Sequence, residues 1–337
     1  MSFKAIGSVK LKSVLMGLLA TIVIVACQSN LNPQPDNAQL ANCRVIQHAL
    51  GEACVPQIPQ RLVSLEAITL ADAFALGVSP IGTVTDFGQV PIHLEKYSRD
   101  FLLLGITEQP NLEKILTLNP DLIIGVDIFS ELIFERLSKI APTTLGQWNG
   151  FSSWRDHFNF VAYVLDKEDQ AKNVWAQYYR RISDIKAALG DQLSEKKVAF
   201  IYAHSGMMNI DTENSFVGSI FTDIGIRQPT YIDVDWGVIP LSEELISEID
   251  ADILFVSAYG DASEQKTLVE WQQKPLWRQL KAVQAGEVYV VNSDIWKGGD
   301  PIAANLVLDD LFKYLVEKEL PETVPAPQSQ NPTPSSA

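Results

Sequence analysis

The sequence predicts an α/β fold with two lobes joined by a long, rigid helix, and three observations support this prediction. Short apolar runs alternate with helical patterns along most of the chain, which is typical of parallel sheets covered by helices on both faces. Residues 153–189 show only helical spacing. Residues 111–126 and 242–256 repeat one plan of helix cap, acid, apolar face, aspartate and buried strand. A repeated unit on either side of a helical segment predicts two similar lobes.

The first lobe is expected over residues 43–150. It begins with a hairpin, because residues 44–48 alternate as a strand does and residues 50–52 provide a turn. Further along, apolar runs predict strands and periodic segments predict helices. We expect strands at 61–65, 80–84, 121–126 and 143–145, and helices at 70–76, 111–118 and 131–139.

Residues 151–190 are expected to connect the lobes through helices. Apolar residues recur there at intervals of three or four, which marks one buried helical stripe. The stripe consists of Val174, Tyr178, Ile182, Ile185 and Leu189. A 20-residue helix spans about 30 Å, roughly the width of a small domain. The sequence therefore predicts a rigid connector rather than a loop.

The second lobe, residues 191–320, returns to the alternation of strands and helices. We expect strands at 197–202, 252–257 and 287–291, and helices at 216–224, 242–249 and 303–316. The helix at 242–249 matches the one at 111–118 in its capping pattern, since Asn and Ser accept first-turn N–H bonds and a nearby Glu suits the helix dipole. The matching pairs are Asn111 with Ser242, Glu113 with Glu244, and Asp121 with Asp252.

The N-terminal end is typical of an exported lipoprotein. Residues 1–26 begin with lysines and no acid and end in an apolar run, as a secretory signal peptide does. The last three, Ile-Val-Ala, lead into Cys27, which resembles the lipobox of bacterial lipoproteins. We therefore expect lipidation of Cys27 and a periplasmic or other extracytoplasmic location, anchored to the membrane. An ordinary signal peptide with an incidental cysteine is the alternative.

Composition adds three expectations. Residues 27–42 read as a flexible tether, and residues 321–337, rich in Pro, Ser and Gln, read as a disordered tail. Cys43 and Cys54 lie in an exported chain, where a disulfide is the usual use of two cysteines; two free buried thiols are the alternative. The formal net charge of −15 argues against binding nucleic acid or anionic lipid through a basic surface.

Five segments together resemble the iron-siderophore and cobalamin substrate-binding proteins of ABC importers. They are PQRLVSLEAITLADAFALGVSPIGTV (59–84), NLEKILTLNPDLIIG (111–125), SFVGSIFTDIGIRQP (215–229), LSEELISEIDADILFV (241–256) and VNSDIWKGGDPIAANLVLDDL (291–311). The resemblance implies a class III periplasmic-binding-protein-like fold with a ligand cleft between the lobes. It also implies a monomer without enzymatic activity or intrinsic cofactor, which delivers an Fe(III)-siderophore or similar ferric chelate to an ABC importer permease.

In this fold the ligand lies at the carboxyl ends of strands of facing sheets, so the residues just after each predicted strand are the candidates. The ligand-binding candidates are Glu66, Phe87 and Trp148 in the first lobe and His204, Trp236, Tyr259, Trp296 and Lys297 in the second. Aromatic faces suit a large, partly apolar chelate. Trp296 is expected to be the main contact, because the family has an aromatic residue at this place. The alternative for Glu66 is that it braces its loop.

The charge of the ligand is expected to be low. Anionic ferric chelates are usually met by Arg or Lys. Here Lys297 is the main cationic candidate, with His93, Arg99 and His204 as weaker ones. We therefore expect a neutral or weakly charged chelate, such as a hydroxamate.

The resemblance also implies an acid on each lobe that pairs with arginines of the permease. Glu244 matches the position in the second lobe. In the first lobe the family has a glutamate where this chain has Ala71, so Asp72 is expected as its substitute. The alternative for both acids is an ordinary solvated helix face.

Three other functions remain open. A cobalamin or haem receptor would use the same fold. Direct metal-ion capture needs several His and carboxylate ligands from different loops, but two of the four histidines, His48 and His157, fall in the hairpin and the connector. No direct metal site is therefore expected. A secreted hydrolase would need a G-x-S-x-G elbow, and AHSGM (203–207) lacks both glycines.

Overall fold

The structure is a computed structural model, and it describes residues 43–97, 101–190, 195–230, 236–249 and 251–318. The expected signal peptide, Cys27, the tether, Arg99 and the tail lie outside the described residues. By its contacts the chain divides into Met1–Cys43 and Arg44–Ala337, and both large sheets belong to the second unit. Within the described ranges, every helix is too short or too polar to span a membrane.

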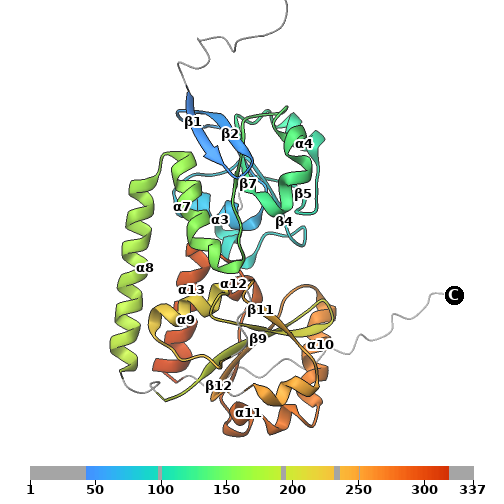
Figure 1. Cartoon of the computed structure of the whole chain (residues 1–337), viewed down its shortest axis with the longest axis vertical. Helices are drawn as coiled ribbons and strands as arrows, with labels where there is room; N and C mark the ends of the chain where they lie inside the picture. Colours follow the sequence, from blue (N-terminus) through green and yellow to red (C-terminus); the bar gives the residue numbers. More distant parts are fainter. Residues whose placement is uncertain (1–42, 98–100, 191–194, 231–235, 250, 319–337) are drawn as a thin grey trace, which may run out of the picture. The chain divides into compact units, whose positions relative to one another are not determined.

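The first sheet has six strands in the order β6-β5-β4-β3-β7-β8; β4, β5 and β7 are labelled in Figure 1. Its strands are β3 (Leu62–Ser64), β4 (Gly82–Thr85), β5 (Leu102–Ile106), β6 (Gln109–Pro110), β7 (Leu122–Val126) and β8 (Thr143–Gly146). Neighbours pair in parallel except β6, which is antiparallel to β5. The carboxyl ends of five strands therefore point the same way.

Short helices follow the strands of the first sheet. They are α3 (Ala67–Ala75), η1 (Ile92–Tyr97), α4 (Leu112–Thr117), α5 (Asp127–Ser130), η2 (Glu131–Ile133) and α6 (Phe134–Leu137). The expected hairpin is confirmed as β1 (Cys43–His48) and β2 (Gly51–Pro56), which form a separate two-stranded sheet. Cys43 and Cys54 are disulfide-bonded, so the pairing expected from the cysteine count is confirmed.

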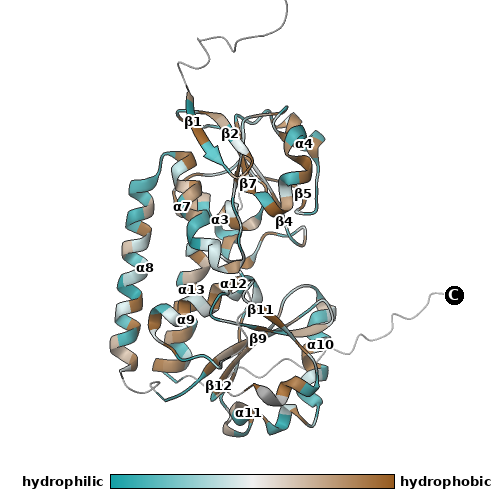
Figure 2. Cartoon of the chain, viewed as in Figure 1, coloured by the Kyte–Doolittle hydropathy of each residue, from teal (hydrophilic) through white to brown (hydrophobic). Residues whose placement is uncertain are grey.

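The second sheet has five strands in the order β11-β10-β9-β12-β13. They are β9 (Val198–His204), β10 (Met207–Asp211), β11 (Val238–Leu241), β12 (Ile253–Ala258) and β13 (Val288–Val290). Strands β9, β12 and β13 are parallel, whereas β10 is antiparallel to both of its neighbours. Strand β9 is buried on both faces, because Phe200 and Tyr202 enter one hydrophobic core and Ile201 and Ala203 enter another. In Figure 2, β9 and β11 are coloured mostly as hydrophobic.

Helical segments surround this sheet and complete the chain. They are η3 (Phe151–Ser153), α9 (Phe216–Ile224), η4 (Glu244–Glu248), α10 (Ala262–Gln273), η5 (Trp277–Gln279), α11 (Lys281–Ala285), α12 (Ser293–Trp296), α13 (Pro301–Leu311) and the π-helical turn η6 (Phe312–Val316). Helix α13 packs against α3 of the first region. Asp300 caps α13 by accepting the Ile302 and Ala303 backbone N–H groups, and its other oxygen lies 3.1 Å from His93 Nε2.

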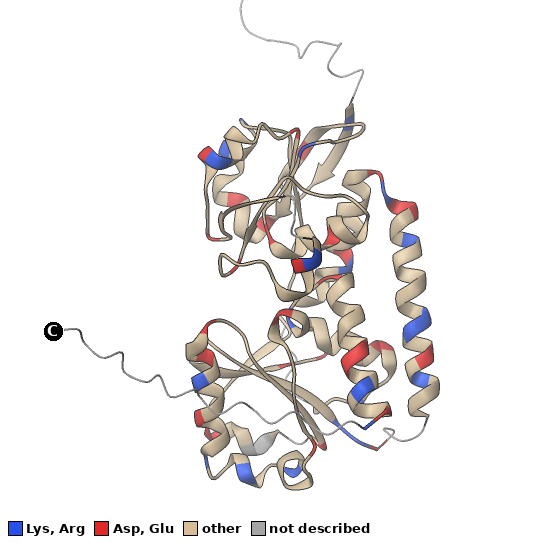
Figure 3. Cartoon of the chain, turned by 180° about the vertical axis from the view of Figure 1, so that it is seen from behind, with Lys and Arg blue, Asp and Glu red and all other residues tan. Residues whose placement is uncertain are grey.

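The predicted connector consists of α7 (Trp154–Leu165) and α8 (Glu168–Leu189). Asp166 separates them with a left-handed φ of 58°. The expected stripe on α8 is confirmed for four of its five residues, since Tyr178, Ile182, Ile185 and Leu189 are buried and belong to a core shared with the second sheet. Val174 is half-buried and packs against the core of the first region. The charged residues of α8, of both signs, are spread along its length (Figure 3), as suits a helix with one solvated face.

The repeated unit differs between the two copies. Asn111 caps α4 by accepting the Lys114 N–H at 2.9 Å, as expected. The second copy is only the 3₁₀ segment η4, preceded by Glu243, whose side chain makes no cap bond. The expectation of an α-helix capped by Ser242 is therefore wrong. In contrast, both aspartates act alike: Asp121 accepts from Arg61 N, and Asp252 accepts from Lys197 N.

Candidate functional site

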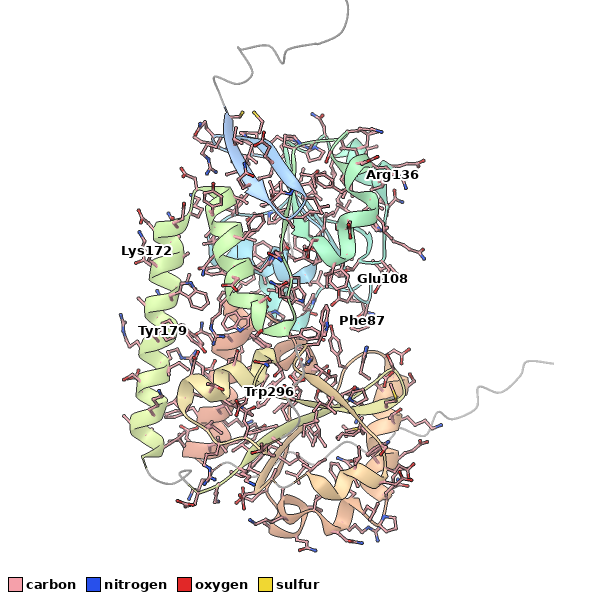
Figure 4. All side chains as sticks on the ribbon, viewed as in Figure 1. Phe87, Glu108, Arg136, Lys172, Tyr179 and Trp296 are labelled. Carbon is pink, nitrogen blue, oxygen red and sulfur yellow. The ribbon has the colours of Figure 1, made fainter. Side chains whose placement is uncertain are left out.

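The carboxyl ends of the two sheets meet at Tyr259. This residue follows β12 in the second sheet, and its hydroxyl donates to Asp86 Oδ2 at 3.0 Å. Asp86 follows β4 in the first sheet, and the next residue, Phe87, packs edge-on against the Tyr259 ring with 5.1 Å between centroids. Phe87, labelled in Figure 4, is 49 % exposed. Two of the predicted ligand candidates are thus brought together from opposite sheets.

A series of ring contacts continues from Tyr259. Its ring lies 5.3 Å from His204 and 6.5 Å from Tyr202, and the His204 Nδ1 is 2.8 Å from the Tyr259 carbonyl oxygen. Separately, Trp148 packs edge-on against Phe151 at 6.3 Å. Lys297 contacts both groups of rings, because its Nζ lies 4.3 Å from the Tyr202 ring centroid and 4.8 Å from the Phe151 ring centroid. We call these six residues the aromatic site: Phe87, Trp148, Phe151, Tyr202, His204 and Tyr259.

Lys297 is buried in an ion pair instead of being open to a ligand. Its Nζ lies 3.0 and 3.3 Å from the two carboxylate oxygens of Asp211, and both side chains are at most 3 % exposed. The Nζ also lies 4.3 Å from the Tyr202 ring centroid. Burial disfavours the ammonium, but Asp211 and Tyr202 outweigh it, so the pKa of Lys297 lies above its ordinary value. The expectation that Lys297 presents a free cation is corrected.

Trp296 is likewise part of the core. Its side chain is 0 % exposed and packs 4.5 Å from Phe255 and 5.0 Å from Phe200, measured between ring centroids. The indole N–H donates to Asp310 Oδ2 at 2.8 Å. Figure 4 shows it within the second sheet region. The expectation that Trp296 is the main ligand contact is corrected, because every polar and apolar part of the side chain is occupied inside the protein.

Glu66 braces the loop after β3. It is 2 % exposed; its Oε1 accepts from the Val126 N–H at 3.3 Å and its Oε2 accepts from the Thr69 hydroxyl at 3.0 Å. Burial raises the pKa of Glu66 to about 8, and the nearby Asp86 and Asp127 carboxylates add to the rise. These contacts favour the bracing role over direct contact with a ligand.

The two expected permease contacts differ in exposure. Asp72 is 0 % exposed, and its Oδ2 lies 3.8 Å from Nε2 of His157, whose pKa is lowered to about 3 by burial. Burial raises the pKa of Asp72 well above its ordinary range. Asp72 therefore does not reach a partner surface, and its expected role is corrected. Glu244, in contrast, is exposed on η4.

The remaining candidate, Trp236, is 52 % exposed just before β11, but it does not join the series of rings among the described residues. Sequence reasoning missed Asp86, Phe151 and Tyr202. Asp86 directly precedes a chosen residue at a strand end, so its position was a usable signal. Tyr202 lies inside a predicted strand, where a core role was the natural interpretation.

Two surface depressions, of about 260 and 340 Å³, lie away from the aromatic site. One is lined by residues of α8, α13 and η6, and the other lies beside α4, between Glu108 and Arg136, which are labelled in Figure 4. Among the described residues, no three His, Cys, Asp or Glu side chains are grouped to hold a metal ion.

Known proteins are similar to this chain in sequence and in fold. Residues 62–295 match the periplasmic binding protein family. The probable siderophore-binding lipoprotein YfiY of Bacillus subtilis is 32% identical over 89% of this chain and 96% of its own length. The Fe(3+)-citrate-binding protein YfmC of the same organism is 34% identical over 83% and 88%. The structure of Staphylococcus aureus SirA complexed with staphyloferrin B matches with a TM-score of 0.71 and 26% identity, over 82% of this chain and 100% of that one.

These likenesses agree with the architecture. The two sheets, the long helix α8 and the contact between carboxyl ends at Tyr259 form the class III arrangement that the sequence predicted. The family match alone covers more than half of the chain. The chain therefore belongs to the periplasmic binding protein family.

Proposed function

We propose that the protein is the substrate-binding component of an ABC importer and captures a ferric siderophore for delivery to the permease. The observation that carries this proposal is the aromatic site, which lies where strands of both sheets end. The names of the relatives, which describe binding of siderophores and ferric citrate, support the same class of ligand. The protein breaks no bond of the ligand in this function; it binds the chelate intact and releases it.

The contacts at Tyr259 indicate how the ligand is admitted. The Tyr259–Asp86 hydrogen bond and the Phe87 ring contact join the two regions directly. A chelate that enters between them replaces these contacts with its own, so the two regions must separate by a small amount first. Aromatic faces then cover the apolar parts of the chelate, and the Tyr259 hydroxyl becomes available as a donor.

Titration of the purified protein by quenching of tryptophan fluorescence tests this proposal. The ligands are ferric hydroxamates, ferric catecholates, ferric citrate, haem and cobalamin. Phe87→Ala should weaken binding of the preferred ferric chelate at least about tenfold, since a half-buried aromatic contact is lost. Tyr179→Ala, which removes a ring that is 50 % exposed on α8, is the matched control. Absence of binding to every ferric chelate, or equal loss in both variants, would overturn the proposal.

Delivery to the permease is proposed to use Glu244. This exposed acid is suited to pair with an arginine of a partner. Glu244→Lys should abolish uptake of the chelate by cells while its affinity for the purified protein stays unchanged. Asp184→Lys, at an exposed position of α8, makes the same charge reversal as a control. Normal uptake by the Glu244 variant would refute this role.

We also propose that Cys27 carries the lipid anchor, with residues 27–42 as the tether. The apolar run that ends at Cys27 supports this assignment. Cys27→Ala should move the protein from the membrane fraction to the soluble fraction, and mass spectrometry of the wild type should show diacylglyceryl on the cysteine. An unmodified N-terminus in the wild type would contradict the proposal.

A further inference from the structure

The aromatic site has an unusual balance of charge. Lys297, whose ammonium group lies over the Phe151 and Tyr202 rings, is held in the buried pair with Asp211, in which both carboxylate oxygens lie within 3.3 Å of Nζ. A ligand therefore meets this lysine as part of a neutral pair. The Nδ1 of His204 lies 2.8 Å from the Tyr259 carbonyl oxygen.

Carboxylates, in contrast, surround the point where the sheets meet. Asp86 accepts from the Thr107 and Tyr259 hydroxyls. Asp127 accepts from the backbone N–H groups of Ile128 and Trp148. These partners are neutral, so they orient the carboxylates without cancelling their charge.

Asp294 completes the group from the second region. It accepts the Ile92 backbone N–H at 3.1 Å. Asp86 and Asp294 both act on Tyr259, whose pKa lies well above its ordinary value because of burial first and then these charges. Three carboxylates therefore lie close to the aromatic site, and within the described parts of the chain none of the three has a Lys or Arg partner.

This balance discriminates between ferric chelates. Citrate and triscatecholate complexes are anions, and in the partly dehydrated site they would face these carboxylates, which have no Lys or Arg partner among the described residues to offset the repulsion. A trishydroxamate complex of Fe(III) is neutral, and one with a free amine is a cation. A cation gains from the same carboxylates, and a neutral chelate loses little.

We infer that the preferred ligand is a neutral or cationic ferric chelate, of the trishydroxamate class, and that Asp86 is a determinant of this preference. The inference rests on the proposed function. It separates this chain from its relative YfmC, which is named for binding Fe(3+)-citrate. It also agrees with the buried Lys297–Asp211 pair, because a lysine whose charge is cancelled by an aspartate does not attract an anionic ligand.

The test uses one linear trishydroxamate in three forms, loaded with Fe(III): with its terminal amine free, acetylated or succinylated. These complexes carry net charges of about +1, 0 and −1 at pH 7 and share the same iron core. Titrations by fluorescence quenching should give the tightest binding for the cation and at least tenfold weaker binding for the anion at low salt. Added salt should narrow this ratio, because it screens partly exposed charges.

Two variants test whether Asp86 causes the preference for the cationic over the anionic form. Asp86→Asn keeps an acceptor for Tyr259 and should reduce the ratio between the cationic and anionic forms at least threefold. Asp169→Asn, on α8 where the acid pairs with Lys172, makes the same change away from the site and should leave the ratio unchanged.

The outcomes separate the inference from the proposed function. Equal affinity for the three forms, tighter binding of the anion, or preference for ferric citrate or a ferric triscatecholate would overturn the charge preference while the binding function stands. If no ferric chelate of any charge binds, the proposed function itself is refuted. An unchanged ratio in Asp86→Asn would refute the role of this residue.

Discussion

Replacement of Glu66 by Gln should stabilise the protein above neutral pH. The carboxyl group is buried, contacts Val126 N–H and the Thr69 hydroxyl, and has its pKa raised to about 8. Glutamine has nearly the same shape and can keep both contacts, since its amide carbonyl accepts and its NH₂ group donates. The substitution therefore removes a proton-binding site with little change in packing.

The direction in which stability changes with pH follows from proton linkage. The unfolded chain releases this proton near pH 4.5, whereas the native protein holds it until about pH 8. Between these values the native state binds more protons, so its stability falls as pH rises. Each pKa unit corresponds to about 1.4 kcal/mol of folding free energy. The stabilisation that the raised Glu66 pKa provides below pH 4.5 is therefore about 5 kcal/mol, and it is lost by about pH 8. About 3 kcal/mol of this stabilisation is lost between pH 5 and 7.

Urea unfolding of wild type and Glu66→Gln at pH 5, 6, 7 and 8 measures this effect. The difference in unfolding free energy should move in favour of the variant by about 3 kcal/mol between pH 5 and 7. Glu135→Gln, at an exposed position of α6, should give a pH profile parallel to the wild type. A parallel profile for Glu66→Gln as well would refute the reasoning.

Three further substitutions test the packing of the site. Trp296→Ala should lower the free energy of unfolding by about 3–5 kcal/mol in urea, because a large core side chain is removed; a loss below about 1 kcal/mol would contradict its core position. Lys297→Met leaves the Asp211 carboxylate buried without its partner and should cost about 3–5 kcal/mol, most of which a second change, Asp211→Leu, should restore; no recovery would contradict the ion-pair argument. Serine at both Cys43 and Cys54 should cost about 2–3 kcal/mol, and unchanged unfolding curves would show that the disulfide does not stabilise the hairpin.

Sequence reasoning located elements best where local signals mark both ends. The helix expected at 216–224 is α9, with the same bounds. Ser215 accepts the Gly218 N–H at its start, and Gly225, with a φ of 84°, ends it. Such signals act within a few residues and are visible in the sequence itself.

Strand β11 was missed because its partner lies far away in the sequence, whereas β10 was missed although a local turn marks its start. Strand β10 pairs antiparallel with β9 through the two-residue turn Ser205–Gly206, whose φ values of 53° and 72° suit a hairpin. In contrast, β11 pairs with β10 across residues 212–237, and no local feature specifies that pairing. Because β10 was missed, one residue of the site was interpreted wrongly. Asp211 ends β10, so the partner of Lys297, 86 positions away in the sequence, was invisible, and the lysine was interpreted as a free cation.

The same limit applies to the aromatic residues. A tryptophan after a strand can face solvent or fold back into the core, and the sequence pattern is identical in both cases. Phe255 and Phe200 provide the surface that buries Trp296, and both come from strands that pair far along the chain. Phe87 and Tyr259, which lie within two residues of the ends of β4 and β12, were correctly placed at the sheet ends.

The topology has a consequence for the order in which the chain is built. Every strand of the first sheet lies between residues 62 and 146, and every strand of the second lies between residues 198 and 290. During synthesis, all hydrogen-bonding partners of the first sheet have emerged before the first strand of the second is made. Neither sheet needs a strand from the other half of the chain to complete its pairing. Unpaired strand edges are therefore exposed for a shorter time in which they could pair with neighbouring chains.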